Sequence, residues 1–214
     1  MTLLSSRDVT GLVLAGGRGS RMGGMDKGLQ NFSGVPLALH ALRRLRPQVA
    51  GTAINANRNL QAYKAFGVPV WPDAGDDYPG PLAGFMSGLS HCPTPWLLTV
   101  PCDTPRFPLD LAARMIDALA KSGQAEIAIA AGPSTDRHGA SALRAQPVFC
   151  LLPTTLRESL HAFIAGGGRK IDAWSGRHRC TVVGFDRPGD DPDAFANANT
   201  LDELKALEAD GTPR

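Results

Sequence analysis

The chain has 214 residues, of which 43% are hydrophobic and 20% are charged, and these values suit one globular α/β domain with a full core. The net charge of +2 gives no strong basic field for nucleic acid, and the sequence contains no apolar run of membrane-spanning length and no apolar secretory signal in residues 1–10. The four cysteines form no Cys-x-x-Cys pair and indicate no zinc site, so we expect a reduced, cytoplasmic protein without nucleic-acid or membrane partners.

The first predicted element is a short buried strand at residues 9–14, and a glycine-rich loop follows it as far as Gly28. Arg18, Arg21 and Lys27 stand between the glycines. Glycine lets the backbone turn its N–H groups toward an anion, and Arg and Lys neutralise the anion's charge. The loop therefore suits a phosphate site, with a flexible surface loop as the alternative.

Two common phosphate motifs are excluded in this loop. A Walker motif requires Gly-Lys-Ser/Thr, but Lys27 precedes Gly28. The dinucleotide fingerprint lacks its third glycine, because Met22 occupies that place. A nicotinamide-dependent dehydrogenase is therefore disfavoured.

Strands and helices alternate in the next part of the chain. Strands are predicted at residues 52–54, 68–71, 96–100 and 127–130, and helices at 36–46, 59–66, 82–91 and 108–121. This alternation predicts an α/β fold with a parallel sheet and right-handed crossovers. Asn59 is expected to cap the second helix. Arg44, with Arg43 and Arg46, is expected on the solvated face and C-terminal end of the first helix.

The C-terminal part of the chain is less regular. Short strands at 140–143 and 148–151 are expected on either side of Gln146-Pro147, followed by a helix at 154–165 and a strand at 180–185. Thr200 and Glu203 form a capping-box pattern for a last helix. We find no repeat or linker, so one domain is expected over 1–214, with its core at about 9–207 and mobile ends.

Polar residues follow the first four predicted strands: Gly16, Asn55, Asp73 and Asp103. In parallel sheets, ligands bind beyond the carboxyl ends of the strands, so these residues are candidates for one site. Asp103 suits Mg²⁺, which usually takes one or two carboxylates together with phosphate oxygens and water. The alternative for Asp73 and Asp103 is a helix cap, and for Asn55 a turn residue.

Short motifs occur in a fixed order along the chain: LAGG at 14–17, RMGG at 21–24, DKG at 26–28, NANR at 55–58, YPGPLAG at 78–84, PCDTP at 101–105 and NANT at 197–200. Together they resemble the nucleotidyltransferases that take a nucleoside triphosphate and release pyrophosphate, most of all the molybdenum cofactor guanylyltransferases. The resemblance runs from about Val9 to about Leu207. It implies a three-layer αβα, Rossmann-like nucleotidyltransferase fold with a mostly parallel sheet. It also implies GMP transfer from GTP to the terminal phosphate of molybdopterin, or its molybdenum-bound form, with release of pyrophosphate.

The resemblance also implies roles for individual residues in GTP binding. Nucleotide contacts are implied for Leu14, Ala15, Gly16, Gly17, Lys27, Asn55, Asp73 and Asp103. Among these, Asp103 would hold Mg²⁺, and Lys27 would bind phosphate with Arg21 as its partner. The Gly16-Gly17 pair is typical of the guanylyl rather than the cytidylyl enzymes, because an added methyl would crowd a purine.

On the acceptor side, Asn197 and Asn199 are similar to the family's pterin-binding asparagines, with a turn and helix cap as the alternative. Arg169 and Lys170 fall where the family has basic residues for the pterin. Molybdopterin-delivery proteins and apo-molybdoenzymes are implied as further partners. The competing functions are a related nucleotidyltransferase for CTP or for a sugar or alditol phosphate, and a non-catalytic carrier of nucleotide or cofactor.

Overall fold

A computed structural model describes residues 4–16, 26–73, 80–135, 141–198 and 200–210. Its main strands are β1 (Val9–Leu14), β4 (Gly51–Asn55), β5 (Val70–Trp71), β6 (Trp96–Pro101), β7 (Ile127–Thr135), β8 (Ser141–Pro153) and β9 (Cys180–Gly184). They form a seven-stranded sheet in the order β5-β4-β1-β6-β8-β7-β9. A separate antiparallel pair consists of β2 (Asn31–Phe32) and β3 (Val35–Pro36).

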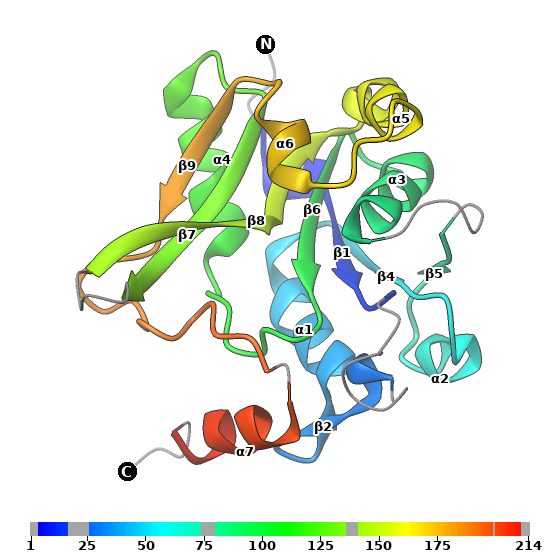
Figure 1. The fold of residues 1–214 in the computed structure, drawn as a ribbon, viewed down its shortest axis with the longest axis vertical. Coiled ribbons are helices and arrows are strands. Elements are labelled where there is room, and N and C mark those ends of the chain that lie inside the picture. Colours follow the sequence, from blue (N-terminus) through cyan, green and yellow to red (C-terminus); the bar gives the residue numbers. More distant parts are fainter. Residues whose placement is uncertain (1–3, 17–25, 74–79, 136–140, 199, 211–214) are drawn as a thin grey trace.

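Helices cover both faces of the large sheet (Figure 1). Buried side chains of α1 (Leu37–Leu45) and α4 (Leu111–Ser122) share one hydrophobic cluster, and those of α3 (Pro81–His91), α5 (Arg157–Ala165) and α6 (Ile171–Ser175) share another. Successive strand residues alternate between the two clusters, as Leu97 and Leu98 do, because side chains along a strand point to opposite faces. The expected αβα architecture with a mostly parallel sheet is confirmed.

Two further helices lie at the edges of this arrangement. The first, α2 (Leu60–Lys64), contributes the buried Tyr63 to the cluster that contains α1 and α4. The last, α7 (Leu201–Asp210), packs Leu204 and Leu207 against Phe32 and Leu37. Of the helices within the described ranges, none has the length and apolar character needed to cross a membrane.

The parallel part of the sheet creates a crevice beside β1. The chain runs from β1 to β4 and β5 on one side, and then returns to β6 on the other side of β1. In open α/β sheets, ligands bind at such a reversal of strand order, beyond the carboxyl ends of the strands. Here those ends are Leu14 and Pro101, and the amide of Cys102 donates a hydrogen bond to the carbonyl of Leu14 at 3.1 Å.

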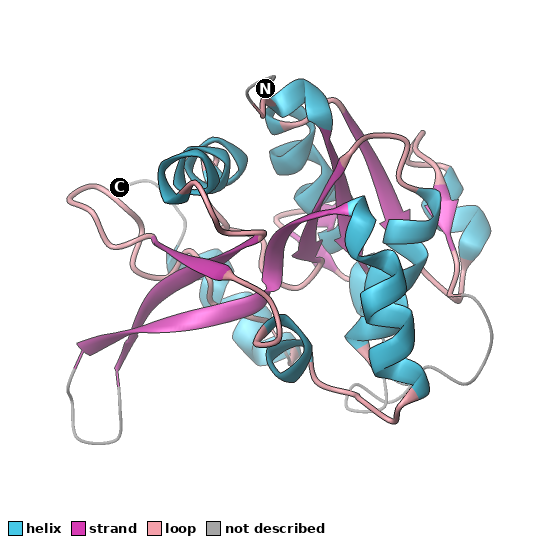
Figure 2. Ribbon diagram, turned by 90° about the horizontal axis from the view of Figure 1, so that it is seen from above, coloured by secondary structure: helices cyan, strands magenta, loops and turns pink. Residues whose placement is uncertain are grey.

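The strand β8 differs from the expected pair of short strands around Gln146-Pro147. It is one strand, antiparallel to both β6 and β7, and Figure 2 shows the long β7–β8 ribbon extending beyond the helices. Its register with β7 jumps from Cys150 to Gln146, opposite Ile129 and Ala130. Pro147 lies inside this irregularity, so its missing N–H removes no bond from the regular β7–β8 ladder.

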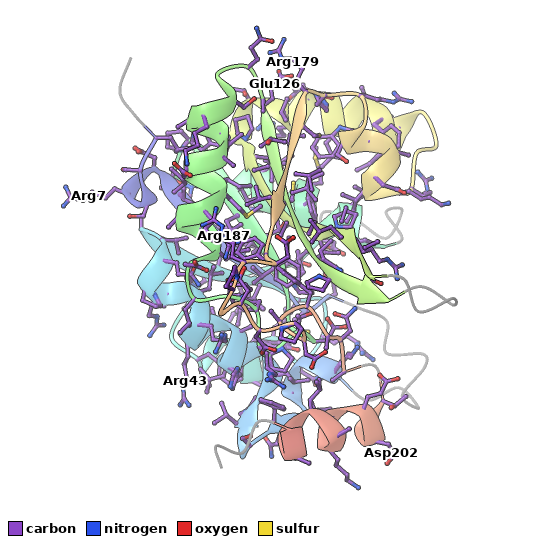
Figure 3. The ribbon with its side chains drawn as sticks, turned by 90° about the vertical axis from the view of Figure 1, so that its left-hand side faces the viewer. Arg7, Arg43, Glu126, Arg179, Arg187 and Asp202 are labelled. Atoms are coloured by element: carbon purple, nitrogen blue, oxygen red, sulfur yellow. The ribbon has the colours of Figure 1, made fainter. Side chains whose placement is uncertain are left out.

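Two expectations about helix ends are wrong because side chains have tertiary partners. Asn59 precedes α2 with a left-handed backbone (φ 50°) and makes no side-chain cap hydrogen bond. Arg44 is half-buried and donates from Nε to the carbonyl of Phe107 at 2.8 Å, whereas Arg43 is exposed and points outward (Figure 3). Arg43 and Arg44 are therefore adjacent on one short helix but differ in their exposure to solvent.

The C-terminal region confirms one expected signal and adds one helix. Thr200 Oγ1 accepts from the amide of Glu203 at 3.1 Å, and Glu203 Oε2 accepts from the amide of Thr200 at 3.3 Å, which confirms the capping box of α7. The short α6 was not expected. It buries Ile171 and Trp174, which lie three residues apart on one helical face.

Candidate active site

The centre of the candidate site is an ion pair between Lys27 and Asp103. Lys27 begins a 3₁₀ turn, Lys27–Leu29, and its Nζ lies 2.6 Å from Oδ2 of Asp103, just beyond the end of β6. Both side chains are about one-fifth exposed, at 22% and 21%, so a ligand can reach them. Asp110, not Asp103, is the residue before the next helix α4, which removes the helix-cap alternative for Asp103.

This pair also bears on metal binding. Within the described ranges, no three His, Cys, Asp or Glu side chains gather into a group that could hold a metal. One accessible carboxylate fits Mg²⁺, which takes its remaining ligands from phosphate and water. The adjacent Cys102 is buried, and this burial raises the pKa of its thiol far above the usual range.

A second polar cluster joins the ends of β4 and β5. Asn55 is buried, and its Nδ2 donates to the carbonyl of Trp71 at 2.9 Å and to Oδ1 of Asp73 at 2.8 Å. Asn57 donates from Nδ2 to Oδ2 of Asp73 at 2.7 Å and accepts from the amide of Asp73 at 2.8 Å. Asp73 is thus held by two amide side chains, and Gly80 precedes the next helix α3, so the helix-cap alternative fails here too.

The first residues after β1 are held against this cluster. The amide of Ala15 donates to the carbonyl of Asn55 at 2.8 Å, and Nδ2 of Asn57 donates to the carbonyl of Gly16 at 3.3 Å. A Cβ on Gly16 would lie 2.8 Å from Oδ1 of Asn55 and 3.0 Å from Nδ2 of Asn57. Glycine is therefore required at residue 16 by the close approach of both asparagines.

Asp26, the residue before Lys27, is held by two side chains from the region of α2. Its Oδ1 accepts from the hydroxyl of Tyr63 at 2.6 Å, and its Oδ2 accepts from Nδ2 of Asn59 at 3.0 Å. Tyr63 is fully buried, and this burial, followed by the hydrogen bond to Asp26, raises the pKa of Tyr63 far above its usual range. The phenol therefore stays protonated and donates.

The C-terminal segment before α7 is attached to the turn that carries Asp103. Thr104 Oγ1 donates to Oδ1 of Asn197 at 2.6 Å, and the amide of Ala198 donates to the carbonyl of Asp103 at 2.9 Å. Figure 1 shows this segment passing below the carboxyl end of β6. Thr200 supplies the cap of α7, so Asn197 is free of the capping role that was its alternative.

A cavity of about 350 Å³ lies beside Asn197. Its lining includes Ser134, Arg144, Gln146, Asp193, Phe195 and Asn197. The direction of β8 explains this position: β6 ends near Asp103, and the antiparallel β8 begins at that end of the sheet with Arg144 and Gln146. The cavity therefore adjoins the same end of the sheet as the ion pair.

The remaining candidate residues are placed differently. Arg169 donates from Nη1 to the carbonyls of Ile164 at 3.0 Å and Gly168 at 2.8 Å, so it binds the C-terminal end of α5, and Lys170 is exposed before α6. Arg21, Gly17 and Asn199 lie outside the described residues, as does Arg18.

Three residues of the observed site had no predicted role. Asn57 and Asp26 appear in the sequence only as members of NANR and DKG, and Arg144 belongs to no motif. Their positions inside these motifs could have marked Asn57 and Asp26 as candidate site residues. Nothing local marks Arg144, because only the direction of β8 brings it to the cavity.

Comparison with known proteins gives consistent matches. The profile of the family described as "MobA-like NTP transferase domain" matches residues 11–182. The chain is 66% identical over 210 residues to the molybdenum cofactor guanylyltransferase of Acidovorax ebreus, covering 98% of this chain and 99% of that protein. It is 59% identical over 208 residues to that of Albidiferax ferrireducens, covering 96% and 98%. Among solved structures, molybdopterin-guanine dinucleotide biosynthesis protein A from Archaeoglobus fulgidus superposes with a TM-score of 0.70 at 20% identity, over 94% and 97% of the two chains, a likeness of fold.

Proposed function

Because this chain belongs to the molybdenum cofactor guanylyltransferases, a family with a MobA-like NTP transferase domain, we propose that it joins GMP from GTP to the terminal phosphate of molybdopterin. The enzyme is a nucleotidyltransferase, and the products are pyrophosphate and the molybdopterin guanine dinucleotide cofactor. The observation that carries the proposal is the accessible ion pair of Lys27 and Asp103, 2.6 Å apart, at the reversal of strand order.

In this proposal GTP occupies the N-terminal half of the site. The cation of Lys27, with Arg21, faces the phosphates, because a lysine supplies a compact charge to phosphate oxygens. The backbone of residues 14–17 approaches the nucleotide. Asn55 and Asp73 lie beside it, and the two asparagine amides that bind Asp73 fix the direction of its carboxylate.

Asp103 is the proposed ligand of a divalent metal, and Mg²⁺ is the metal we propose. Bound there with nucleotide phosphates, Mg²⁺ would neutralise charge that develops on the phosphate oxygens. Lys27 supplies a second positive charge next to the same carboxylate. Its Nζ donates to Oδ2 of Asp103, and this hydrogen bond orients the ammonium at the edge of the crevice.

Molybdopterin occupies the C-terminal half in this proposal, with its ring system in the cavity lined by Gln146, Arg144 and Asn197. The supporting observation is the hydrogen bond between Asn197 and Thr104, which ties the cavity wall to the residue after Asp103. Roles for Asn199, Arg169 and Lys170 at the pterin rest on the sequence resemblance.

The chemistry requires positioning and charge neutralisation. An oxygen of the molybdopterin phosphate forms a bond to the α-phosphorus of GTP, and the bond from that phosphorus to the β-phosphate oxygen breaks, so pyrophosphate leaves with the electron pair. A phosphate monoester is largely dianionic near neutral pH, since its second pKa is about 6. No side chain therefore has to remove a proton from the nucleophile.

The test incubates the protein with Mg²⁺, molybdopterin and GTP labelled at the α-phosphate, and identifies the pterin product. We expect label in a pterin dinucleotide and one pyrophosphate released for each. Equal use of CTP, or transfer to a sugar or alditol phosphate in place of the pterin, would support the related nucleotidyltransferases instead. Binding of GTP without pyrophosphate release would support the carrier. Delivery proteins, apo-molybdoenzymes and a cytoplasmic location stay predictions.

A further inference from the structure

We propose that Asp26 is a positioning residue, which together with Tyr63 and Asn59 holds Lys27 in place for the nucleotide phosphates. The inference rests on the proposed function, because it takes Lys27 as a phosphate-binding residue. Asp26 itself would touch neither substrate.

The first observation is that an acidic side chain stands next to a phosphate-binding cation. A carboxylate that faced a triphosphate would repel it. Here both carboxylate oxygens of Asp26 are engaged, one by the hydroxyl of Tyr63 at 2.6 Å and the other by the amide of Asn59 at 3.0 Å. The negative charge is therefore held by two hydrogen bonds, one from Tyr63 in α2 and one from Asn59 just before it.

The second observation is the backbone at this point. Asp26 has an extended conformation (φ −78°, ψ 110°), and the 3₁₀ turn begins with the next residue. Lys27 is the first residue of that turn and follows Asp26 directly, so fixing the side chain of Asp26 limits where the backbone of Lys27 can lie. From this backbone the Nζ of Lys27 reaches Oδ2 of Asp103 at 2.6 Å.

The third observation is the conformation and contact of Asn59. Its backbone is left-handed at φ 50°, a conformation that asparagine adopts more readily than most residues other than glycine. The side chain does not cap α2 but donates to Asp26, 33 residues earlier in the chain. Gly28 packs tightly on the same group, since a Cβ there would clash with the hydroxyl of Tyr63.

Together these contacts fix Asp26, Lys27 and Gly28, the last residues of the glycine-rich loop, against Tyr63. Tyr63 is rigid because it is fully buried in the cluster with α1 and α4, and it packs edge-on against Phe66 at 5.9 Å between ring centres. A buried hydroxyl that donates to a carboxylate is a strong, short hydrogen bond. Because Tyr63 cannot move in the core, the side chain of Asp26 is fixed, and the backbone of the adjacent Lys27 is restrained with it.

The experiment is a double-mutant cycle on GTP affinity, measured by calorimetry without molybdopterin. Tyr63→Phe removes only the hydroxyl, and we expect it to weaken GTP binding about tenfold, near the lower end of the effect of a hydrogen bond to a charged group. In the Lys27→Ala background, the same substitution should change affinity less than about twofold, because the residue being positioned is gone.

Two further variants make the cycle decisive. Asn59→Gly removes the second hydrogen bond and keeps the left-handed backbone accessible, so it should weaken GTP binding about threefold with the same dependence on Lys27. This residue is exposed, so the variant carries the test even where Tyr63→Phe fails to fold. The control is Thr10→Val, which loses a hydrogen bond to Thr94 at the opposite end of β1 and should lower stability but leave GTP affinity unchanged.

Equal losses from Tyr63→Phe with and without Lys27 would overturn the inference and make the contact merely structural. Failure of GMP transfer by a protein that shows the expected cycle would overturn only the proposed acceptor reaction. A wild-type chain that does not bind GTP would overturn both.

Discussion

The side chain of Asn197 has one observed contact and one proposed contact, and substitutions can separate them. Its Oδ1 accepts a hydrogen bond from Thr104, which is fully buried, and its amide nitrogen is the donor that we assign to molybdopterin. Asn197→Ala removes both functions. Asn197→Asp keeps an acceptor for Thr104 and replaces only the donor, adding a negative charge that opposes an anionic ligand.

The structure sets the expected magnitudes. Asn197→Ala leaves the buried Thr104 hydroxyl without its partner, which costs about 1–3 kcal/mol of unfolding free energy. In a chain of this length that corresponds to a fall in Tm of about 2–12 °C. Asn197→Asp should keep Tm close to the wild-type value. Loss of a hydrogen bond to a charged group, about 1.5–3 kcal/mol, should weaken molybdopterin binding by about 10- to 100-fold in both variants.

The assay pairs thermal unfolding with two titrations, one of molybdopterin and one of GTP. We expect GTP affinity to stay within about threefold of wild type, since surface charges at a distance have modest effects in salt. Wild-type molybdopterin affinity in Asn197→Asp would refute the assignment of the amide donor. A selective loss of GTP binding would mean that the cavity beside Asn197 binds the nucleotide and not molybdopterin.

Three further predictions concern the side chain of Asp103, the backbone at Gly16 and the ion pair of Arg114. Asp103→Ala should abolish Mg²⁺-dependent pyrophosphate release while circular dichroism shows a native fold, because this side chain lies at a strand end; activity in the folded variant would remove it from the site. Gly16→Ala should raise the KM for GTP about tenfold or more, as its methyl meets Oδ1 of Asn55 at 2.8 Å; unchanged kinetics would mean that the loop can shift freely. Arg114→Ala should lower the unfolding free energy by about 1–3 kcal/mol in urea titrations, because the buried Nη1 of Arg114 donates to both carboxylate oxygens of Asp190 at 2.8 and 2.9 Å; a loss below about 0.5 kcal/mol would show that this pair is as weak as a surface pair.

The sequence is most informative where the signals are local. Apolar runs and the residues after them identify β1, β4, β5 and β6 and the positions of Asn55 and Asp103, since each strand and its following turn are written in consecutive residues. The order of short motifs adds the family and the reaction. The expectation that Lys27 shares a site with Asp103 comes from the motif order alone, because Lys27 lies in a turn and not at the end of a strand.

The contacts that finish the site lie outside the reach of local pattern. Tyr63 is 37 residues from Asp26, and Thr104 is 93 residues from Asn197. Asn59 looks like a helix cap in sequence, and only the fold shows that a distant carboxylate takes its amide. Pro147 reads as the end of a strand, yet it lies in a register shift of a longer one. Strand direction, which brings Arg144 to the cavity, is not encoded in any single segment.

The late position of Asn197 in the chain has a consequence for how the protein is made. The last strand of the sheet, β9, ends at Gly184, so every strand has been synthesised before the ribosome adds Asn197 and Ala198. The bonds from these two residues to Thr104 and Asp103 close a long loop, a step that costs chain entropy and follows the formation of nearer contacts. A nascent chain thus contains the strands around the crevice beside β1 before it contains the segment bound to Thr104 and Asp103, and a chain that ended just after β9 would lack that segment.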